Sequence, residues 1–273
     1  MPNIDKIISA VNHNSDYINF VPLAAKAWSK FYDKKLTLAY VKFGDEKIDE
    51  QNLNNLKEYC DAIHPFNRIE GIDYGVQSKV SRMYLASLYE SSYNLIVDID
   101  MIPLDGYFAC LLRDADESSI VKWNCDYHHY QTPPNIGKWP MDKTSAYGKT
   151  FKNIINKNDL DYEDLLKSWT GFKQDSRSNI FAGWNNFSDE SLLKCLWDEW
   201  DDKKEYKIPR DSYDNKRYQR LNHELVGRLD KSGLDNLSNV DINNFFECHG
   251  PRDFINNKSN WYDFIEKFTD QTT

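Results

Sequence analysis

Two aspartates follow an apolar run near the middle of the sequence, where residues 94–100 read NLIVDID. Such a run is typical of a buried parallel strand, and residues two apart along a strand, here Asp98 and Asp100, point to the same side. Two carboxylates held between apolar segments repel each other, and a divalent cation with oxygen ligands would remove that penalty. The pair therefore predicts a metal site. The alternative is an exposed turn in which both aspartates accept hydrogen bonds from backbone amides.

A pair of cations precedes the aspartates. Lys79 and Arg82 lie in segment 76–89, whose apolar residues recur at helical spacing. Residues three apart are neighbours on the surface of a helix, so both side chains are expected on one face of a helix that leads to the aspartates. Cations in that place could contact phosphate groups. The alternative is an ordinary solvated helix face.

These charged residues must be positioned by a scaffold of alternating elements. Short apolar or β-branched runs at residues 4–11, 36–41 and 94–99 predict strands, and residues 17–32, 46–60 and 76–89 predict helices. Alternating strands and helices with short joins predict a parallel sheet covered on both faces, and ligands bind such sheets at the carboxyl ends of the strands. Residues 12–14, the loop after Val41 and residues 98–100 should therefore meet there.

The second half of the chain is less regular. Residues 120–123, 179–184 and 245–248 predict short strands, and residues 126–141 form a loop that contains prolines. Helices are expected at residues 149–155, 162–169, 188–200 and 213–229. No internal repeat or low-complexity linker divides the chain, so we expect one domain.

Composition and charge exclude several classes of partner. The formal net charge of −9 disfavours both nucleic acid and anionic membranes. The five cysteines are widely spaced without a CxxC pair, which predicts neither a disulfide framework nor a zinc cluster and suits a reducing compartment. The first residues lack the pattern of a signal peptide, and no run approaches the roughly 20 apolar residues of a membrane span. We expect a cytoplasmic protein, in the host cytoplasm if the chain is viral.

The order of these features resembles the nucleotide-sugar glycosyltransferases of the GT-A fold, of the glycogenin-like or small viral and bacterial kind. The resemblance rests on the helix with Lys79 and Arg82, the apolar strand, the Asp-x-Asp motif and the apolar MIPL run after it. It covers residues 4–104, with two short later pieces at 179–183 and 249–252. It implies an α/β fold with a GT-A-like, mixed but mainly parallel central sheet flanked by helices and a more helical C-terminal part.

The resemblance also implies roles for parts of the chain and for single residues. Within one domain, residues 1–104 would form the nucleotide-binding half, and residues 105–273 the acceptor side with a C-terminal metal- and phosphate-binding segment. Asp98, Asp100 and His249 would bind Mn²⁺ or Mg²⁺, and Asp98 would also contact the ribose of a UDP- or GDP-type sugar donor. The residues placed around the donor are Val11, Asn12, His13, Asp73, Tyr74, Lys79, Arg82, Asp98 and Arg252.

The acceptor side of the site is less defined. The reaction implied is transfer of a hexose or pentose to a glycan or another hydroxyl acceptor, and an inverting enzyme needs a carboxylate as general base. Asp189 follows the piece at 179–183 and is the first candidate. Ser188 and Asp189 also suit the start of a helix, as N-cap and first-turn acid. Asp126, beside His128 and His129, is the second candidate.

Two other functions are compatible with parts of the sequence. Haloacid-dehalogenase-like phosphatases also end a strand with Asp-x-Asp and bind magnesium. Their motif usually opens the chain and has Thr or Val two residues after the second Asp, where Ile102 stands here. A carbohydrate-binding protein without turnover would use the abundant aromatic residues, 14% of the chain, and would bind sugar without Asp100.

Overall fold

The central sheet is built from four parallel strands and extended by a mixed group. The computed structural model describes residues 4–103, 118–123, 143–171, 196, 200, 204–208, 219–221 and 245–249. β3 (Cys60–Phe66), β2 (Leu36–Val41), β1 (Lys6–Val11) and β4 (Tyr93–Val97) pair in parallel. β7 (Lys143–Tyr147) runs antiparallel to both β4 and β6 (Ser119–Trp123), and β6 pairs in parallel with β8 (Lys204–Ile208). This seven-stranded order, β3-β2-β1-β4-β7-β6-β8, confirms the mixed, mainly parallel sheet.

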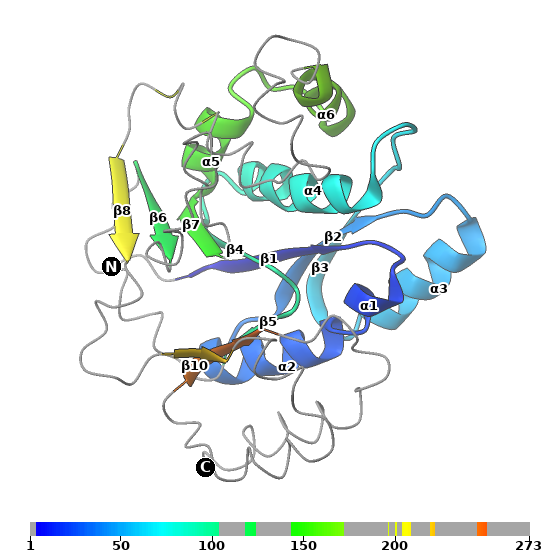
Figure 1. Cartoon of the computed structure of the whole chain (residues 1–273), viewed down its shortest axis with the longest axis horizontal. Helices are drawn as coiled ribbons and strands as arrows, with labels where there is room; N and C mark the ends of the chain where they lie inside the picture. The colour runs from blue at the N-terminus through cyan, green and yellow to red at the C-terminus, as the bar shows by residue number, and fades with distance from the viewer. Residues whose placement is uncertain are drawn as a thin grey trace, which may run out of the picture.

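Helices cover both faces of this sheet, as Figure 1 shows. α1 (Ser15–Ile18), α2 (Val21–Tyr32) and α3 (Glu46–Leu56) lie on one face, where α2 contributes the buried Trp28 to the core. α4 (Tyr74–Leu88), α5 (Gly148–Ile155) and α6 (Tyr162–Gly171) cover the other face around Met83 and Phe151. β2 and β4 are buried at every position because they lie between two such layers. In the described part of the chain, no helix is long and apolar enough to cross a membrane.

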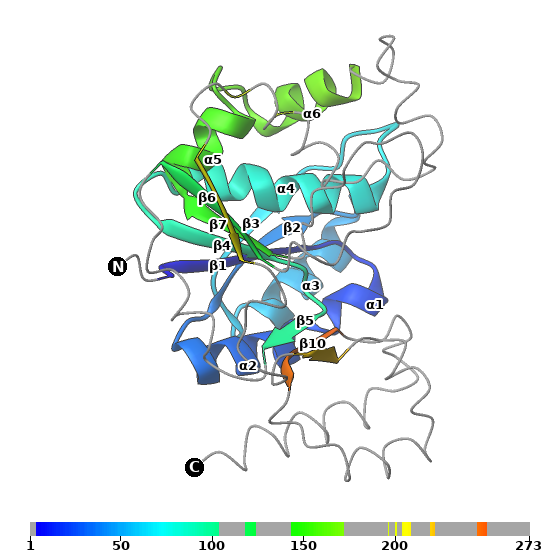
Figure 2. The same cartoon turned by 60° about the vertical axis from the view of Figure 1, so that its left-hand side comes forward.

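A second, small sheet lies beside α2. It contains β5 (Met101–Pro103), β10 (Phe245–His249) and β9 (Gln219–Leu221), in the order β5-β10-β9. Figures 1 and 2 both show β5 and β10 side by side on the α2 side of the central sheet. Since β5 follows the aspartate motif directly, this small sheet brings a distant part of the chain to the motif.

Several predicted elements have different bounds in the structure. The helix predicted for residues 17–32 is divided into α1 and α2, because Pro22 cannot donate a backbone hydrogen bond and instead occupies the first turn of a new helix. The helix predicted for residues 46–60 ends at Leu56, and Cys60 begins β3. The sequence of β3, CDAIHPF, is interrupted by Asp61 and His64 and contains Pro65, which an edge strand tolerates, so its pattern did not predict a strand.

The second half of the chain contains strands that its local pattern did not predict. β7 has the polar sequence KTSAY but is held between β4 and β6. β9 lies inside the helix predicted for residues 213–229, and that prediction is wrong there because pairing with β10 decides the backbone conformation. Residues 126–141 and 179–184 lie outside the described residues, as does most of 172–273, on which the expected helical C-terminal part depends.

A cluster of titratable side chains links β1, β3 and the end of α4. Nε2 of His64 lies 2.7 Å from the hydroxyl of Tyr89, and the ammonium of Lys6 lies 4.5 Å from the centre of the Tyr89 ring. Lys6 also forms an ion pair with Asp61, at 3.0 Å. Burial and the nearby charge of Lys6 lower the pKa of His64, against a smaller opposing effect of Asp61. His64 is therefore neutral in the folded protein at neutral pH.

We predict that this histidine makes the protein less stable as the pH falls. The pKa of His64 is lower in the folded than in the unfolded chain, where it is about 6.5. The unfolded chain therefore takes up the proton first, and stability present above that pH is lost as the pH falls through the folded pKa. Urea unfolding of the wild type and of His64→Gln between pH 7.5 and 5.5 tests this. We expect a shallower decline in the variant; parallel curves would contradict the prediction.

Candidate active site

The two aspartates lie in the turn that joins β4 to β5. β4 ends at Val97, two residues before the predicted end of the strand, and the amide of Met101 donates to the carbonyl of Asp98 at 3.1 Å. The hydroxyl of Ser9 in β1 donates to the carbonyl of Val97 at 2.9 Å and holds the turn against the neighbouring strand. Both carboxylates are only partly buried, and the side chain of Asp98 is 34% exposed. The turn is thus at the predicted edge of the sheet, with both acids accessible.

Arg82 reaches this turn from α4. Its side chain is only 5% exposed, and its guanidinium Nη1 forms an ion pair with Oδ1 of Asp98. Lys79 lies one turn earlier on α4 and is exposed. The two cations therefore differ in burial, and Arg82 holds a buried positive charge directly beside the first aspartate. A guanidinium in this position is suited to bind anionic or hydroxyl oxygen atoms.

His249 is brought to the same place by strand pairing. β10 pairs antiparallel with β5, and in this register His249 is opposite Met101, the residue after Asp100. The backbone thus places the three predicted metal ligands at neighbouring positions, although His249 is far away in the sequence. Among the side chains that the structure describes, no three His, Cys, Asp or Glu groups form a metal cluster. Of the three predicted metal ligands, Asp98 and Asp100 are the ones whose side chains are described.

Three rings gather at the ends of β1 and β2 and the start of α4. The ring of His13 lies 4.3 Å from that of Phe43 and 4.7 Å from that of Tyr74, measured between centroids. The hydroxyl of Tyr74 donates to the carbonyl of Phe43 at 3.1 Å, and the guanidinium of Arg68 lies 4.6 Å from the Tyr74 ring. His13 and Tyr74 were predicted to be near the nucleotide. Phe43 and Arg68 were not, although the loop after Val41 was expected at this edge.

The other predicted nucleotide-binding residues in this half mainly hold the loops in place. Val11 is buried at the end of β1. Asn12 is 7% exposed; its Nδ2 donates to the hydroxyl of Ser78 at 3.0 Å, and its Oδ1 accepts from the amide of Asn14 at 2.8 Å. Asp73 is the N-cap of α4 and accepts from the first amides of that helix. These bonds tie the end of β1 to α4 and fix the positions of His13 and Tyr74.

A buried carboxylate positions the loop that carries Phe43. Asp49 accepts hydrogen bonds from the amides of Phe43 (2.8 Å) and Gly44 (3.0 Å) and from the hydroxyl of Tyr40 (2.8 Å). Gly44 has a φ of +99°, so the loop needs glycine at this turn. Burial acts to raise the pKa of Asp49, but these hydrogen bonds outweigh it and lower the pKa. Burial raises the pKa of Tyr40 to about 12, so Tyr40 stays a donor.

We predict that Asp49→Asn loosens this loop. The amide group of asparagine cannot accept all three hydrogen bonds, so we expect the free energy of unfolding to fall by about 1–2 kcal/mol, measured with urea. Asp45→Asn is the matched control, because Asp45 caps α3 and asparagine caps helices equally well. Equal stability of the two variants would show that the Asp49 carboxylate does not hold the loop.

Three predicted site residues lie in parts of the chain that the structure does not describe: the two candidates for the general base and the donor-side Arg252. Asp126, Asp189 and Arg252 lie outside the described residues, and both candidates for the general base therefore stay predictions. The site that the structure describes consists of the aspartate turn, Arg82, the backbone position of His249 and the three rings. All of its parts lie at or next to the carboxyl edge of the parallel strands.

The mixed, mainly parallel sheet flanked by helices is a GT-A-like fold. Among solved structures, the chain is similar to the galactosyltransferase LgtC in complex with donor and acceptor sugar analogs, with a TM-score of 0.50 and 13% identity. The alignment covers 90% of this chain and 86% of LgtC. An active-site mutant of LgtC aligns equally well, with a TM-score of 0.50 and 14% identity. At such identities the similarity establishes the fold.

Two other similar structures are also glycosyltransferases. GlyE from Streptococcus pneumoniae has a TM-score of 0.48 and 11% identity; the alignment covers 89% of this chain and 54% of GlyE, so the chain spans about half of that protein. Mouse xyloside xylosyltransferase 1 has a TM-score of 0.41 and 10% identity, with 90% of this chain and 97% of the enzyme covered. No protein-family model matches the sequence, and the comparison with curated proteins gives no match.

Proposed function

We propose that the chain is a glycosyltransferase that moves a sugar from a nucleoside-diphosphate sugar to a hydroxyl acceptor, with Mn²⁺ or Mg²⁺ bound at the aspartate turn. The observation that carries this proposal is the ion pair between Arg82 and Asp98 at the carboxyl edge of a GT-A-like sheet. Arg82 supplies a buried cation and the aspartate turn supplies accessible carboxylates, a combination that suits a diphosphate bound together with a divalent metal. LgtC, whose fold is similar, was solved with donor and acceptor sugar analogs.

The ligand types at the turn fit the proposed metal. Asp98 and Asp100 offer carboxylate oxygens, which both Mg²⁺ and Mn²⁺ prefer, and an imidazole at position 249 is compatible with Mn²⁺. A divalent ion held there would neutralise part of the charge of the diphosphate leaving group. Lys79 and Arg252 remain candidates for further phosphate contacts.

The residues of the chain itself would bind and orient the donor. His13, Phe43 and Tyr74 form an aromatic surface next to the end of β1, which suits contact with a nucleotide base. Arg82 would place its positive charge where negative charge grows as the bond between the sugar and the diphosphate breaks, and it would then stabilise the transition state more than the ground state. In an inverting reaction, Asp189 or Asp126 would accept the proton of the acceptor hydroxyl.

Calorimetry with MnCl₂ together with UDP, GDP and their sugars tests the proposal. We expect one nucleoside diphosphate to bind with Mn²⁺ and its affinity to fall at least about tenfold in Asp100→Ala. Asp164→Ala is the matched control, because Asp164 is an exposed aspartate on α6. Absence of nucleotide binding, or an equal affinity of Asp100→Ala, would refute the metal–nucleotide site. If the wild type binds sugar but gives no transfer product with any of these donors, the carbohydrate-binding protein is favoured instead.

The phosphatase alternative receives no support from the fold. The similar structures described above are glycosyltransferases, and the motif is followed by β5, which belongs to a separate small sheet. The calorimetric screen would identify the donor nucleotide and its sugar, and NMR of the anomeric product would distinguish inversion from retention.

A further inference from the structure

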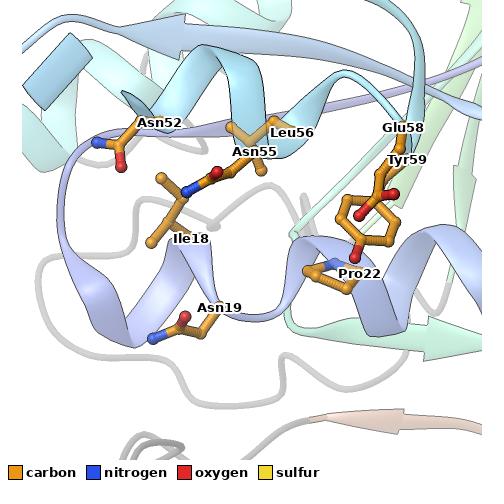
Figure 3. A pocket seen from close by; sticks show the side chains of 8 residues that line it. All are labelled: Ile18, Asn19, Pro22, Asn52, Asn55, Leu56, Glu58 and Tyr59. Carbon is orange, nitrogen blue, oxygen red and sulfur yellow. The ribbon is translucent and has the colours of Figure 1, made fainter. Parts of the chain in front are cut away.

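A pocket of about 360 Å³ opens between the start of α2 and the end of α3. Figure 3 shows its lining side chains, which come from α1, α2, α3 and the residues just before β3. No residue of the candidate active site lines this pocket. Its volume lies near the lower end of the range of about 300–1,000 Å³ for small-molecule sites. The pocket is therefore large enough for a small ligand and separate from the aspartate turn.

The polar side chains of the pocket offer both acceptors and donors of hydrogen bonds. Nδ2 of Asn52 donates to the hydroxyl of the fully buried Tyr40 at 3.0 Å, and Nδ2 of Asn19 donates to the carbonyl of Ser15 at 2.7 Å. Each of these two carboxamides is thereby oriented and keeps its Oδ1 as an acceptor and its second N–H as a donor. The carboxylate of Glu58 adds further acceptors. Such a set suits a ligand that carries several hydroxyls, because each hydroxyl can both donate and accept a hydrogen bond.

The orientation of Asn52 is fixed from inside the protein. The Tyr40 hydroxyl that accepts from Asn52 donates in turn to Asp49, at 2.8 Å. Because Tyr40 and Asp49 are both buried, Asn52 cannot rotate without breaking a buried hydrogen-bond chain. The pocket therefore presents at least one pre-oriented acceptor, which lowers the entropic cost of binding.

Apolar surface lies next to these acceptors. Ile18, Pro22 and the buried Leu56 line the pocket together with the ring of Tyr59. In Figure 3, Tyr59 lies close to Pro22 at one end of the pocket, and Ile18 faces Asn55 toward the other. A flat apolar surface beside carboxamide and carboxylate groups matches a pyranose ring. The C–H groups of such a ring form an apolar face, and its hydroxyls project from the edge.

The charge of the pocket further restricts the class of ligand that can bind. Glu58 is the charged residue among those that line the pocket, and the chain as a whole carries a net charge of −9. An anionic sugar or a phosphate would be repelled there, because no cation lines the pocket among the described residues. A neutral sugar avoids this penalty.

We propose that this pocket binds one neutral pyranose unit of a saccharide, at a site distinct from the proposed donor site. Binding there requires neither metal nor nucleotide, so the inference goes beyond the proposed function and stands or falls separately from it. In a glycosyltransferase, such a site would hold a sugar unit of a longer glycan away from the reacting end. The expected selectivity is for neutral sugars over their uronic acid counterparts.

NMR titration of ¹⁵N-labelled protein with D-glucose, D-galactose and D-xylose, without metal or nucleotide, tests the proposal. We expect at least one of the three sugars to shift the amide signals of residues 18–22 and 52–59. The affinity should fall at least about tenfold in Asn55→Ala and in Tyr59→Ala. Asn54→Ala is the matched control, since Asn54 is an exposed neighbour on α3 that does not line the pocket and instead accepts from Lys57.

Three outcomes would overturn the proposal. They are no shift at these residues with any of the three sugars, equal affinities of Asn55→Ala and Asn54→Ala, or sugar binding only when Mn²⁺ and nucleotide are present. Because Asn55 is exposed, its truncation is expected to leave the fold intact even if Tyr59→Ala lowers stability. Asp100→Ala should bind the sugar as the wild type does, which separates this site from the aspartate turn.

Discussion

Replacing Arg82 by methionine is expected to lower the rate constant of sugar transfer by about 10²–10³, the cost of removing one pre-organised group that stabilises charge in a transition state. Arg82 is suited to this role because its side chain is 5% exposed and already held by Asp98. A charge that is fixed before the substrate arrives needs no reorganisation during the reaction. Methionine fills a similar volume without the charge, so packing around α4 should be retained.

The matched control for this variant is Lys79→Met. Lys79 lies one turn earlier on α4 but is exposed, and water screens an exposed charge. We expect it to change the rate less than about tenfold, and mainly through KM. Steady-state kinetics with the donor found by calorimetry would separate the two effects. Equal losses in both variants would mean that α4 acts through its overall charge. An unchanged kcat in Arg82→Met would remove Arg82 from the proposed mechanism.

Replacing Gly148 by alanine is expected to lower the free energy of unfolding by about 3 kcal/mol, the upper part of the usual range for overpacking. Gly148 begins α5, and its amide donates to the carbonyl of Ser92 at 2.9 Å. A Cβ atom there would lie 2.0 Å from the carbonyl oxygen of Tyr89 and 2.8 Å from the amide nitrogen of Glu90. These neighbours are backbone atoms, so the contact can be relieved only by moving α5 away from the loop after α4.

Gly71→Ala separates this steric effect from that of backbone conformation. Gly71 has a φ of +82°, but a Cβ atom there would have no neighbour within 4 Å. Only the left-handed conformation would be strained, at a cost of about 1–2 kcal/mol. Urea unfolding of both variants measures the difference. If Gly148→Ala were no less stable than Gly71→Ala, the close packing of α5 against residues 89–92 would not be needed for stability.

The elements around the aspartates could be predicted because their signals are local. β1, β2 and β4 are nearly continuous apolar runs, and the apolar residues of α4 recur at helical spacing, so each pattern can be recognised within one segment. The rule that ligands bind at the carboxyl ends of parallel strands then placed residues 12–14, the loop after Val41 and residues 98–100 together. The structure confirms this arrangement for the described residues.

Other features required contacts between distant segments. β3 is interrupted by Asp61, His64 and Pro65, and β7 is mainly polar. Both become strands because β2, β4 and β6 offer their backbones for pairing. The position of His249 opposite Met101 depends on the register of β10 with β5, which no local pattern contains. The same holds for β9, which lies where a charged helix was expected.

The amino-acid sequence by itself determined the apolar strands β1, β2 and β4, the helix α4 that precedes β4, and the position of the two aspartates at the end of β4. Only the tertiary structure decided that Arg82 is buried against Asp98 while Lys79 is exposed, and that Asp49 holds the loop of Phe43. The physical reason is that periodicity shows which residues of an element share a face. Which face is buried, and which distant backbone pairs with it, depends on the spatial order and register of the strands in the sheets.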